Sequence, residues 1–166
     1  GEIWFDGREV TRLSESDLAE FRNRAVGFIF QFHYLLPEFD ALENISLPVR
    51  MRGLTKKEST EKATGLLKAV GLSNRFNHRP AELSGGEQQR VAIARSMVGD
   101  PRLILADEPT GNLDIGTART VAELLFGVVR DGGRSLIMAT HNLELAEKAD
   151  RIFRLKDGRL WKERGG

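Results

Sequence analysis

The chain has 166 residues, of which 40% are hydrophobic and 30% charged, and its 25 basic and 24 acidic residues leave a net charge of +1. That balance gives no electrostatic footprint for nucleic acids or anionic membranes, so we expect no nucleic-acid partner. The absence of cysteine excludes disulfides and thiolate metal sites, and the 3 histidines lack the paired spacing of a histidine metal site.

Turn signals, helix caps and apolar periodicity predict alternating strands and helices. In chain order, we expect strands over 2–5 and 8–10, a helix over 15–23, a strand over 25–30, helices over 41–51, Thr55–Val70 and from Ser84 to about Gly99, a strand over 103–106, a helix over 114–130, a strand over 135–139, a helix over 142–148 and a strand over 151–155. This alternation favours an α/β domain with a largely parallel sheet, into which residues 33–100 insert a helical segment.

Local signals support several of these boundaries. Asp6-Gly7 is a hairpin turn signal between the first two strands. Thr55 and Glu58 have the spacing of a capping box, in which each side chain bonds the backbone N–H of the other residue. Pro48 is expected to limit or kink the helix over 41–51, because proline lacks the N–H that a helix interior needs.

Two adjacent carboxylates, Asp107 and Glu108, follow the apolar strand over 103–106. The carboxyl ends of strands in an α/β sheet are where ligands bind. One acid at such a place can hold magnesium, and the next can polarise an attacking water. Taken alone, the pair is equally compatible with a strand that ends in polar residues at the surface.

The segment Leu83-Ser-Gly-Gly-Glu87 opens a predicted helix with two glycines after Ser84. Glycine lets the backbone approach a phosphate, and the free N–H groups and the dipole at a helix N-terminus favour an anion. Ser84 can cap the helix or donate to a phosphate oxygen. By composition alone, a plain capped helix with a glycine-rich first turn explains the segment as well.

Together these two segments resemble the signature motif and the Walker B strand of the ATP-binding-cassette family. Three further positions follow in the family's order: Gln31 resembles the Q-loop glutamine, Gly111-Asn-Leu-Asp114 the D-loop, and His141 the switch histidine. Taken alone, Gln31 and His141 are better explained as polar residues at strand ends. The five motifs in order make the resemblance specific, and it spans nearly all of the chain.

The resemblance implies a role for each matching residue. Asp107, with Gln31, would organise Mg²⁺, and Glu108 would be the catalytic base or water-orienting acid. Gln31 and His141 would also sense the γ-phosphate of ATP. The signature residues Ser84, Gly85, Gly86 and Glu87 would bind the ATP held by a second ATPase subunit in a head-to-tail homodimer. Asp114 of the D-loop, also at the nucleotide, would couple the two sites across that pair.

The same resemblance implies a P-loop NTPase-like parallel sheet core from residues 1–32 and 101–166, with residues 33–100 as the helical subdomain. The family's phosphate loop, Gly-x-x-x-x-Gly-Lys-Ser/Thr, is missing from the sequence, which contains no Gly-Lys dipeptide. We therefore expect a fold that lacks the Walker A strand and helix, in a chain cut before Gly1. We expect this chain alone to bind ATP weakly, not to hydrolyse it, and to fold poorly.

Within the family, residues 32–44, 77–80 and 106–114 are similar to the ATPases of bacterial lipoprotein-releasing systems. Close relatives serve macrolide or peptide exporters and a cell-division complex. The similarity implies ATP and Mg²⁺ as ligands, transmembrane permease subunits as partners, and a peripheral location on the cytoplasmic face of the inner membrane. The large apolar groups of the loop 32–39 either pack on their own domain or dock to a permease helix.

Two rival interpretations remain open at this point. DNA-repair and chromosome-organising ATPases share the signature and Walker B, but carry long heptad coiled coils or cysteine-rich modules that the interval 32–82 lacks. A degenerate, non-catalytic cassette would explain the missing phosphate loop, whereas the intact Glu108 and His141 argue against it.

Overall fold

The computed structural model describes residues 1–165. Its elements in chain order are β1 (Trp4–Phe5), β2 (Arg8–Glu9), a 3₁₀ turn (Val10–Arg12), α1 (Glu15–Ala25), β3 (Val26–Ile29), α2 (Ala41–Arg50), α3 (Lys56–Ala69), a second 3₁₀ turn (Pro80–Glu82), α4 (Gly85–Met97), β4 (Leu103–Asp107), α5 (Ile115–Asp131), β5 (Ser135–Ala139), α6 (Leu143–Ala146), β6 (Ile152–Lys156) and β7 (Arg159–Arg164). No helix within this range is long and apolar enough to cross a membrane.

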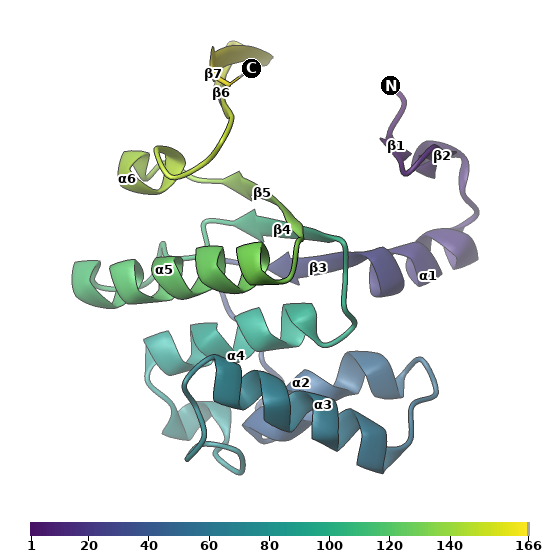
Figure 1. The fold of residues 1–166 in the computed structure, drawn as a ribbon, viewed down its shortest axis with the longest axis vertical. Helices are drawn as coiled ribbons and strands as arrows, with labels where there is room; N and C mark the ends of the chain where they lie inside the picture. Colours follow the sequence, from purple (N-terminus) through teal and green to yellow (C-terminus); the bar gives the residue numbers. More distant parts are fainter. Residues whose placement is uncertain (166) are drawn as a thin grey trace.

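The centre of the fold is a parallel sheet of three strands in the order β3-β4-β5 (Figure 1). Its register brings the carboxyl ends of the strands to one edge of the sheet. The chain continues from that edge into Gln31 after β3, Glu108 after β4 and His141 after β5. The sheet therefore collects residues that are far apart in the sequence.

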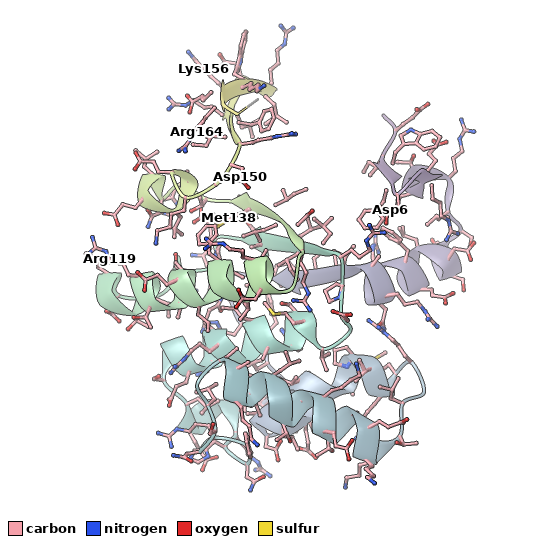
Figure 2. All side chains as sticks on the ribbon, in the orientation of Figure 1. Asp6, Arg119, Met138, Asp150, Lys156 and Arg164 are labelled. Atoms are coloured by element: carbon pink, nitrogen blue, oxygen red, sulfur yellow. The ribbon has the colours of Figure 1, made fainter. Side chains whose placement is uncertain are left out.

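One face of the sheet packs against α4 and α5, with α2 and α3 beneath α4 (Figure 1). Alternate residues of β4, Ile104 and Ala106, point to that face and are buried with Ile93 of α4 and Leu125 of α5. Met138 of β5, labelled in Figure 2, packs against the same core. A single hydrophobic cluster thus runs from the sheet through α4 to the outer helices.

The opposite face of the sheet is much less covered. The register places Phe28, Leu105 and Ile137 side by side on that face. Ile137 keeps 61% of its surface exposed, and no strand within residues 1–165 pairs with the outer edge of β5. Exposed apolar surface and an unpaired edge are both unfavourable for an isolated domain.

Two antiparallel hairpins, β1/β2 and β6/β7, stand at the ends of the chain. Both turns are Asp-Gly pairs with positive φ at each residue, 49° and 77° at Asp6 and Gly7, and 52° and 71° at Asp157 and Gly158. This is the backbone of a type I′ turn, which favours these residue types. Figure 2 shows the hairpins, marked by Asp6 and Lys156, on the side of the sheet away from α2 and α3.

The predicted elements form with small shifts in their ends, apart from two differences. Helix α2 forms over nearly the predicted range, with Pro48 inside it, and continues to Arg50. The helix expected over 142–148 is reduced to the short α6. The strand expected over 151–155 forms as β6, but it pairs with β7, which was not predicted, and not with the parallel sheet.

The parallel sheet and the helical layer confirm the predicted fold class. The division into a helical subdomain over 33–100 and a core of 1–32 and 101–166 stays a prediction. Helix α4 packs on β3 and α5 as well as on α2 and α3, so the two parts share one hydrophobic core.

Candidate active site

The last residue of β4 and the residue after it form the acidic end of the strand. Asp107 is exposed beside Ala139 of β5, so its carboxylate is open to a ligand. The backbone N–H of Glu108 donates to the carbonyl of Ala139 at 2.9 Å, which extends the β4–β5 pairing by one bond. Glu108 has a φ of 43°, a left-handed conformation that is costly for a residue with a side chain.

Three donors hold the Glu108 carboxylate. The backbone N–H and the ring Nδ1 of His141 both lie 2.7 Å from Oε1, and the Thr140 hydroxyl donates to Oε2 at 3.1 Å. Because Oε1 is an acceptor, the Nδ1 of His141 carries the proton in this contact. The imidazole is 81% exposed, which leaves its other nitrogen accessible from solvent.

Gln31 is fixed to the loop that follows Glu108. Its Nε2 donates to Asn112 Oδ1 at 3.0 Å, and Asn112 Nδ2 donates back to the Gln31 carbonyl at 3.1 Å. A Cβ at Gly111 would lie 3.0 Å from Gln31 Nε2, so glycine permits this close approach. The Q-loop and D-loop segments are thereby joined directly.

Asp107 and Gln31, the predicted magnesium ligands, do not form a complete metal site by themselves. Among residues 1–165, no group of three or more His, Asp or Glu side chains is placed to hold a metal ion. Mg²⁺ at a phosphate site, however, needs only one or two protein oxygens, because phosphates and water supply the others. The exposed Asp107 carboxylate and the Gln31 Oε1, which accepts no hydrogen bond within the described residues, are donors of the right kind.

The signature segment forms the first turn of α4. Ser84 is the N-cap and accepts from the Glu87 N–H at 3.3 Å, while Glu87 accepts from the Ser84 N–H at 2.9 Å and from Arg75 at 2.9 Å. The plain capped helix is therefore present. The cap does not use the N–H groups of Gly85 and Gly86, which stay free of any partner within residues 1–165.

Asp114 caps α5 in the same way, accepting from the Thr117 N–H at 3.1 Å. The two capped ends meet: a Cβ at Gly86 would overlap Thr117 Cγ2, and a Cβ at Gly85 would lie 3.5 Å from Leu113 Cδ2. The predicted signature and D-loop residues thus lie side by side at paired helix N-termini, where Ser84, Gly85 and Asp114 are exposed and Gly86 is buried against Thr117.

The caps predict that the protein loses stability in acid. The Ser84 N–H, and to a smaller extent Arg75, lower the pKa of Glu87 below its ordinary 4.5, against the opposing effect of burial. Hydrogen bonds from Thr117, first from its side chain, lower the pKa of Asp114 below 3.8. As the pH falls, the unfolded chain takes up these protons first, so the stabilisation present above pH 4.5 is lost as the pH passes down through the folded-state values.

Urea unfolding between about pH 6 and pH 3 measures this loss. Glu87→Gln cannot titrate and is expected to flatten the pH dependence of the unfolding free energy below its ordinary pKa of 4.5. An unchanged slope in that variant would show that the Glu87 cap does not contribute to acid sensitivity.

A pocket of about 500 Å³ opens beside Glu108 and His141. Its wall includes Ala118 of α5, Leu145 of α6 and Arg119, which Figure 2 labels near one end of α5. The site is therefore a carboxylate and an imidazole at the rim of an open hollow that is large enough to admit a water to the carboxylate.

The structure brings the predicted residues together in two groups: Glu108 with His141, and the D-loop with Gln31 and the signature segment. It also shows contacts to residues that were not predicted. Glu108 and His141 touch directly, whereas Gln31 touches neither of them nor Asp107 among the described contacts. Thr140 and Asn112 were not predicted to have roles. Asn112 lies inside the D-loop segment and Thr140 beside His141, so their places in the motifs were the available signal.

Comparison with known proteins gives consistent matches. Residues 1–111 match the sequence profile of the ABC transporter family. The lipoprotein-releasing system ATP-binding protein LolD of Geobacter metallireducens is 52% identical over 160 residues, covering 96% of this chain and 71% of that protein. LolD 2 of Caulobacter vibrioides is 49% identical, covering 96% and 70%.

Solved structures agree with these sequence matches. The post-hydrolysis dimer of the ATP-binding cassette MJ0796, bound to ADP and Pi, superposes with a TM-score of 0.86 at 37% identity and covers 100% of this chain and 75% of that one. A second dimeric structure of MJ0796, described as a bacterial ABC transporter cassette, gives a TM-score of 0.86 at 38% identity.

Proposed function

The chain belongs to the ABC transporter family as an ATPase cassette, and from this premise we propose that it is the motor subunit of a bacterial lipoprotein-releasing transporter. One observation carries the proposal: Thr140 and His141 hold the Glu108 carboxylate at the carboxyl edge of the sheet. Identities of 49% and 52% to LolD proteins support the choice of the lipoprotein-releasing system.

The proposed reaction is hydrolysis of ATP to ADP and phosphate. Glu108 orients the attacking water and accepts its proton as the water oxygen bonds to the γ-phosphorus and the bond to the ADP oxygen breaks. The exposed ring nitrogen of His141 would face the γ-phosphate, and it can donate there only when both ring nitrogens carry a proton, because Nδ1 already uses its proton on Glu108. Mg²⁺, held by Asp107 and the Gln31 amide oxygen, would neutralise charge on the phosphates.

A second copy of the chain is the proposed partner across the nucleotide. The paired N-termini of α4 and α5 offer free N–H groups and two helix dipoles, which favour an anion such as a phosphate. The dimers described for the cassette MJ0796 support this arrangement. The residues proposed to face the ATP of the other copy are Ser84, Gly85, Gly86, Glu87 and Asp114.

The loop after Gln31 is the proposed contact with the transmembrane permease subunits, of the LolC/LolE kind. Phe32 and Tyr34 are 61% and 64% exposed, and their rings lie 6.4 Å apart. Phe30 packs edge-on against Tyr34 at 5.5 Å. An exposed aromatic cluster next to Gln31 suits a partner helix better than packing on its own domain. With a permease as the partner, the proposed location is the cytoplasmic face of the inner membrane.

The missing phosphate loop leads to a further part of the proposal. The 166-residue sequence contains no glycine followed directly by lysine. This chain therefore has no lysine-bearing loop of the kind that cradles the β- and γ-phosphates. We infer that the chain by itself does not hydrolyse ATP, and that an upstream extension supplying the loop restores hydrolysis.

A paired MgATP hydrolysis assay tests the proposal. One arm is the 166-residue chain, and the other is the same chain extended upstream in its own reading frame. We expect phosphate release only from the extended chain, and stimulation when LolC/LolE-type membrane subunits are added. Membrane subunits of a macrolide exporter or of a cell-division complex serve as the matched comparison for the choice of partner.

The outcomes separate the alternatives. Hydrolysis by the short chain would mean that the phosphates bind somewhere other than the expected loop. Stimulation by exporter or cell-division subunits alone would move the function to those systems. Silence of the extended chain with every membrane partner would favour a degenerate, non-catalytic cassette.

A further inference from the structure

A buried glutamine of α4 lies between the two loops of the candidate site. Gln89 has 0% exposure, in contrast to the partly exposed Gln88 beside it. Its Nε2 donates to the carbonyl of Pro109 at 2.7 Å and to the carbonyl of Phe30 at 3.3 Å. Its Oε1 lies 2.5 Å from His33 Nδ1. One side chain thus joins Phe30 and His33, which lie in one loop, to Pro109, which follows a different strand and is distant in the sequence.

These contacts determine which way the amide faces. The carbonyls of Phe30 and Pro109 can only accept hydrogen bonds, so the amide nitrogen must point at them and the amide oxygen at His33. An oxygen in that place requires a proton on the Nδ1 of His33. The neutral ring is therefore held as the Nδ1–H tautomer, opposite to the Nε2–H form that a free imidazole favours.

The contacted groups adjoin the residues proposed for chemistry. Phe30 immediately precedes Gln31, and Pro109 immediately follows Glu108, whose φ of 43° is strained. A polar group buried without partners is costly, so the amide strongly favours the loop arrangement that satisfies all three contacts.

Helix α4 also holds the loop after Gln31 at a second place. Arg95 donates to the carbonyls of His33 and Tyr34, both at 2.7 Å. Tyr34 has a φ of 46°, so this loop, like the loop at Glu108, is strained at a residue with a side chain. Each strained turn of the site is thus tied to α4 by a side-chain donor.

We propose that Gln89 is a positioning residue that couples the loop after Gln31 to the peptide after Glu108. The inference rests on the proposed function, because it states that Gln89 fixes the distance between two parts of the proposed motor. These parts are the loop after Gln31, which would face the membrane partner, and Glu108, which would activate water. A shift of the 31–34 loop moves the Gln89 amide, and the amide moves Pro109 and the strained Glu108. Gln89 is fully buried, and its amide is occupied by Phe30, His33 and Pro109, so the proposed role is indirect.

Histidine-selective ¹⁵N NMR tests the coupling without requiring hydrolysis. The chain's 3 histidines include both reporters, because His33 touches Gln89 and the His141 amide donates to Glu108. Spectra are recorded at about pH 8, where an ordinary imidazole is neutral, on the 166-residue chain and on its upstream extension. We expect the Nδ1–H tautomer for His33 in the parent protein.

Gln89→Met keeps a side chain of similar volume but removes all three contacts. We expect the His33 ring to revert to the Nε2–H form and the His141 amide signal to shift. Gln88→Met is the matched control, because Gln88 donates to the carbonyls of Pro80 and Leu83 on a different loop. That control is expected to leave both histidine signals in place.

Kinetics of the extended chain supply a second readout. Gln89→Met is expected to lower kcat about tenfold while the KM for MgATP changes less than about twofold, because the residue acts on the spacing of catalytic groups and not on nucleotide binding. Should Gln89→Met fail to fold, His33→Ala removes one contact from a partly exposed position and is expected to shift the same His141 amide.

Several results would overturn the inference. An Nε2–H His33 in the parent protein would refute the amide arrangement. A His141 amide unchanged by Gln89→Met or His33→Ala would reduce Gln89 to a packing role. If the extended parent chain does not hydrolyse ATP, the proposed function fails, whereas the histidine spectra still decide whether the two loops are coupled.

Discussion

Replacement of Glu108 by glutamine is expected to reduce kcat for MgATP hydrolysis by the extended chain by about 10²- to 10⁴-fold, the usual contribution of a general base. Glutamine keeps the size of the side chain and can still accept from the His141 N–H, so the fold and nucleotide affinity should persist. It cannot take the proton of an attacking water, and its NH₂ would face the hydroxyl of Thr140 or the ring of His141. Steady-state phosphate release and equilibrium binding of ATP measure the two effects separately.

Glu144→Gln is the matched control for this substitution. Glu144 lines the same pocket, but its carboxylate forms a loose pair with Arg119 at 3.4 Å, with both side chains largely exposed. Surface pairs of this kind contribute little, so we expect kcat to stay within about twofold of the parent value. Equal losses in both variants would show that charge around the pocket matters and that Glu108 has no special role.

Local chemistry in the sequence predicted the elements well. Thr55 with Glu58 and Ser84 with Glu87 form the capping boxes that their spacing indicates, and Asp6-Gly7 forms the expected turn. These signals act over a few residues, which is why a single sequence reveals them. The carboxylate pair at Asp107 is also a local signal, whereas His141 was assigned a role only from its resemblance to the switch histidine of the family.

The contacts that join the motifs could not be predicted in this way. Gln31 and Asn112 are 81 residues apart, and only the order of the strands brings them together. Gln89 stands in a polar Glu-Gln-Gln-Arg run, and no periodicity distinguishes the buried Gln89 from the partly exposed Gln88. The partner of β6 is also set by the fold as a whole: within residues 1–165, β6 pairs with β7 and not with the parallel sheet.

Gly27 is the position where packing of the sheet against α4 is most sensitive to added volume. A Cβ there would overlap the Ser96 carbonyl oxygen and lie 2.7 Å from Ile104 Cδ1. The carbonyl belongs to the α4 backbone, so relief requires β3 and α4 to separate. We expect Gly27→Ala to lower the free energy of unfolding by about 3 kcal/mol, the upper end of ordinary overpacking.

Gly65→Ala provides the control of opposite sign. Gly65 lies in α3 with nothing within 4 Å of an added Cβ, so alanine should raise stability by about 0.5–1 kcal/mol through helix propensity. Urea unfolding curves with equal slopes give both values. A loss below about 0.5 kcal/mol in Gly27→Ala would mean that β3 and α4 separate easily. In that case, a fixed short distance between β3 and α4 could not be the reason that Gln89 of α4 reaches the carbonyl of Phe30. That carbonyl is the contact by which Gln89 holds the start of the loop that carries Gln31.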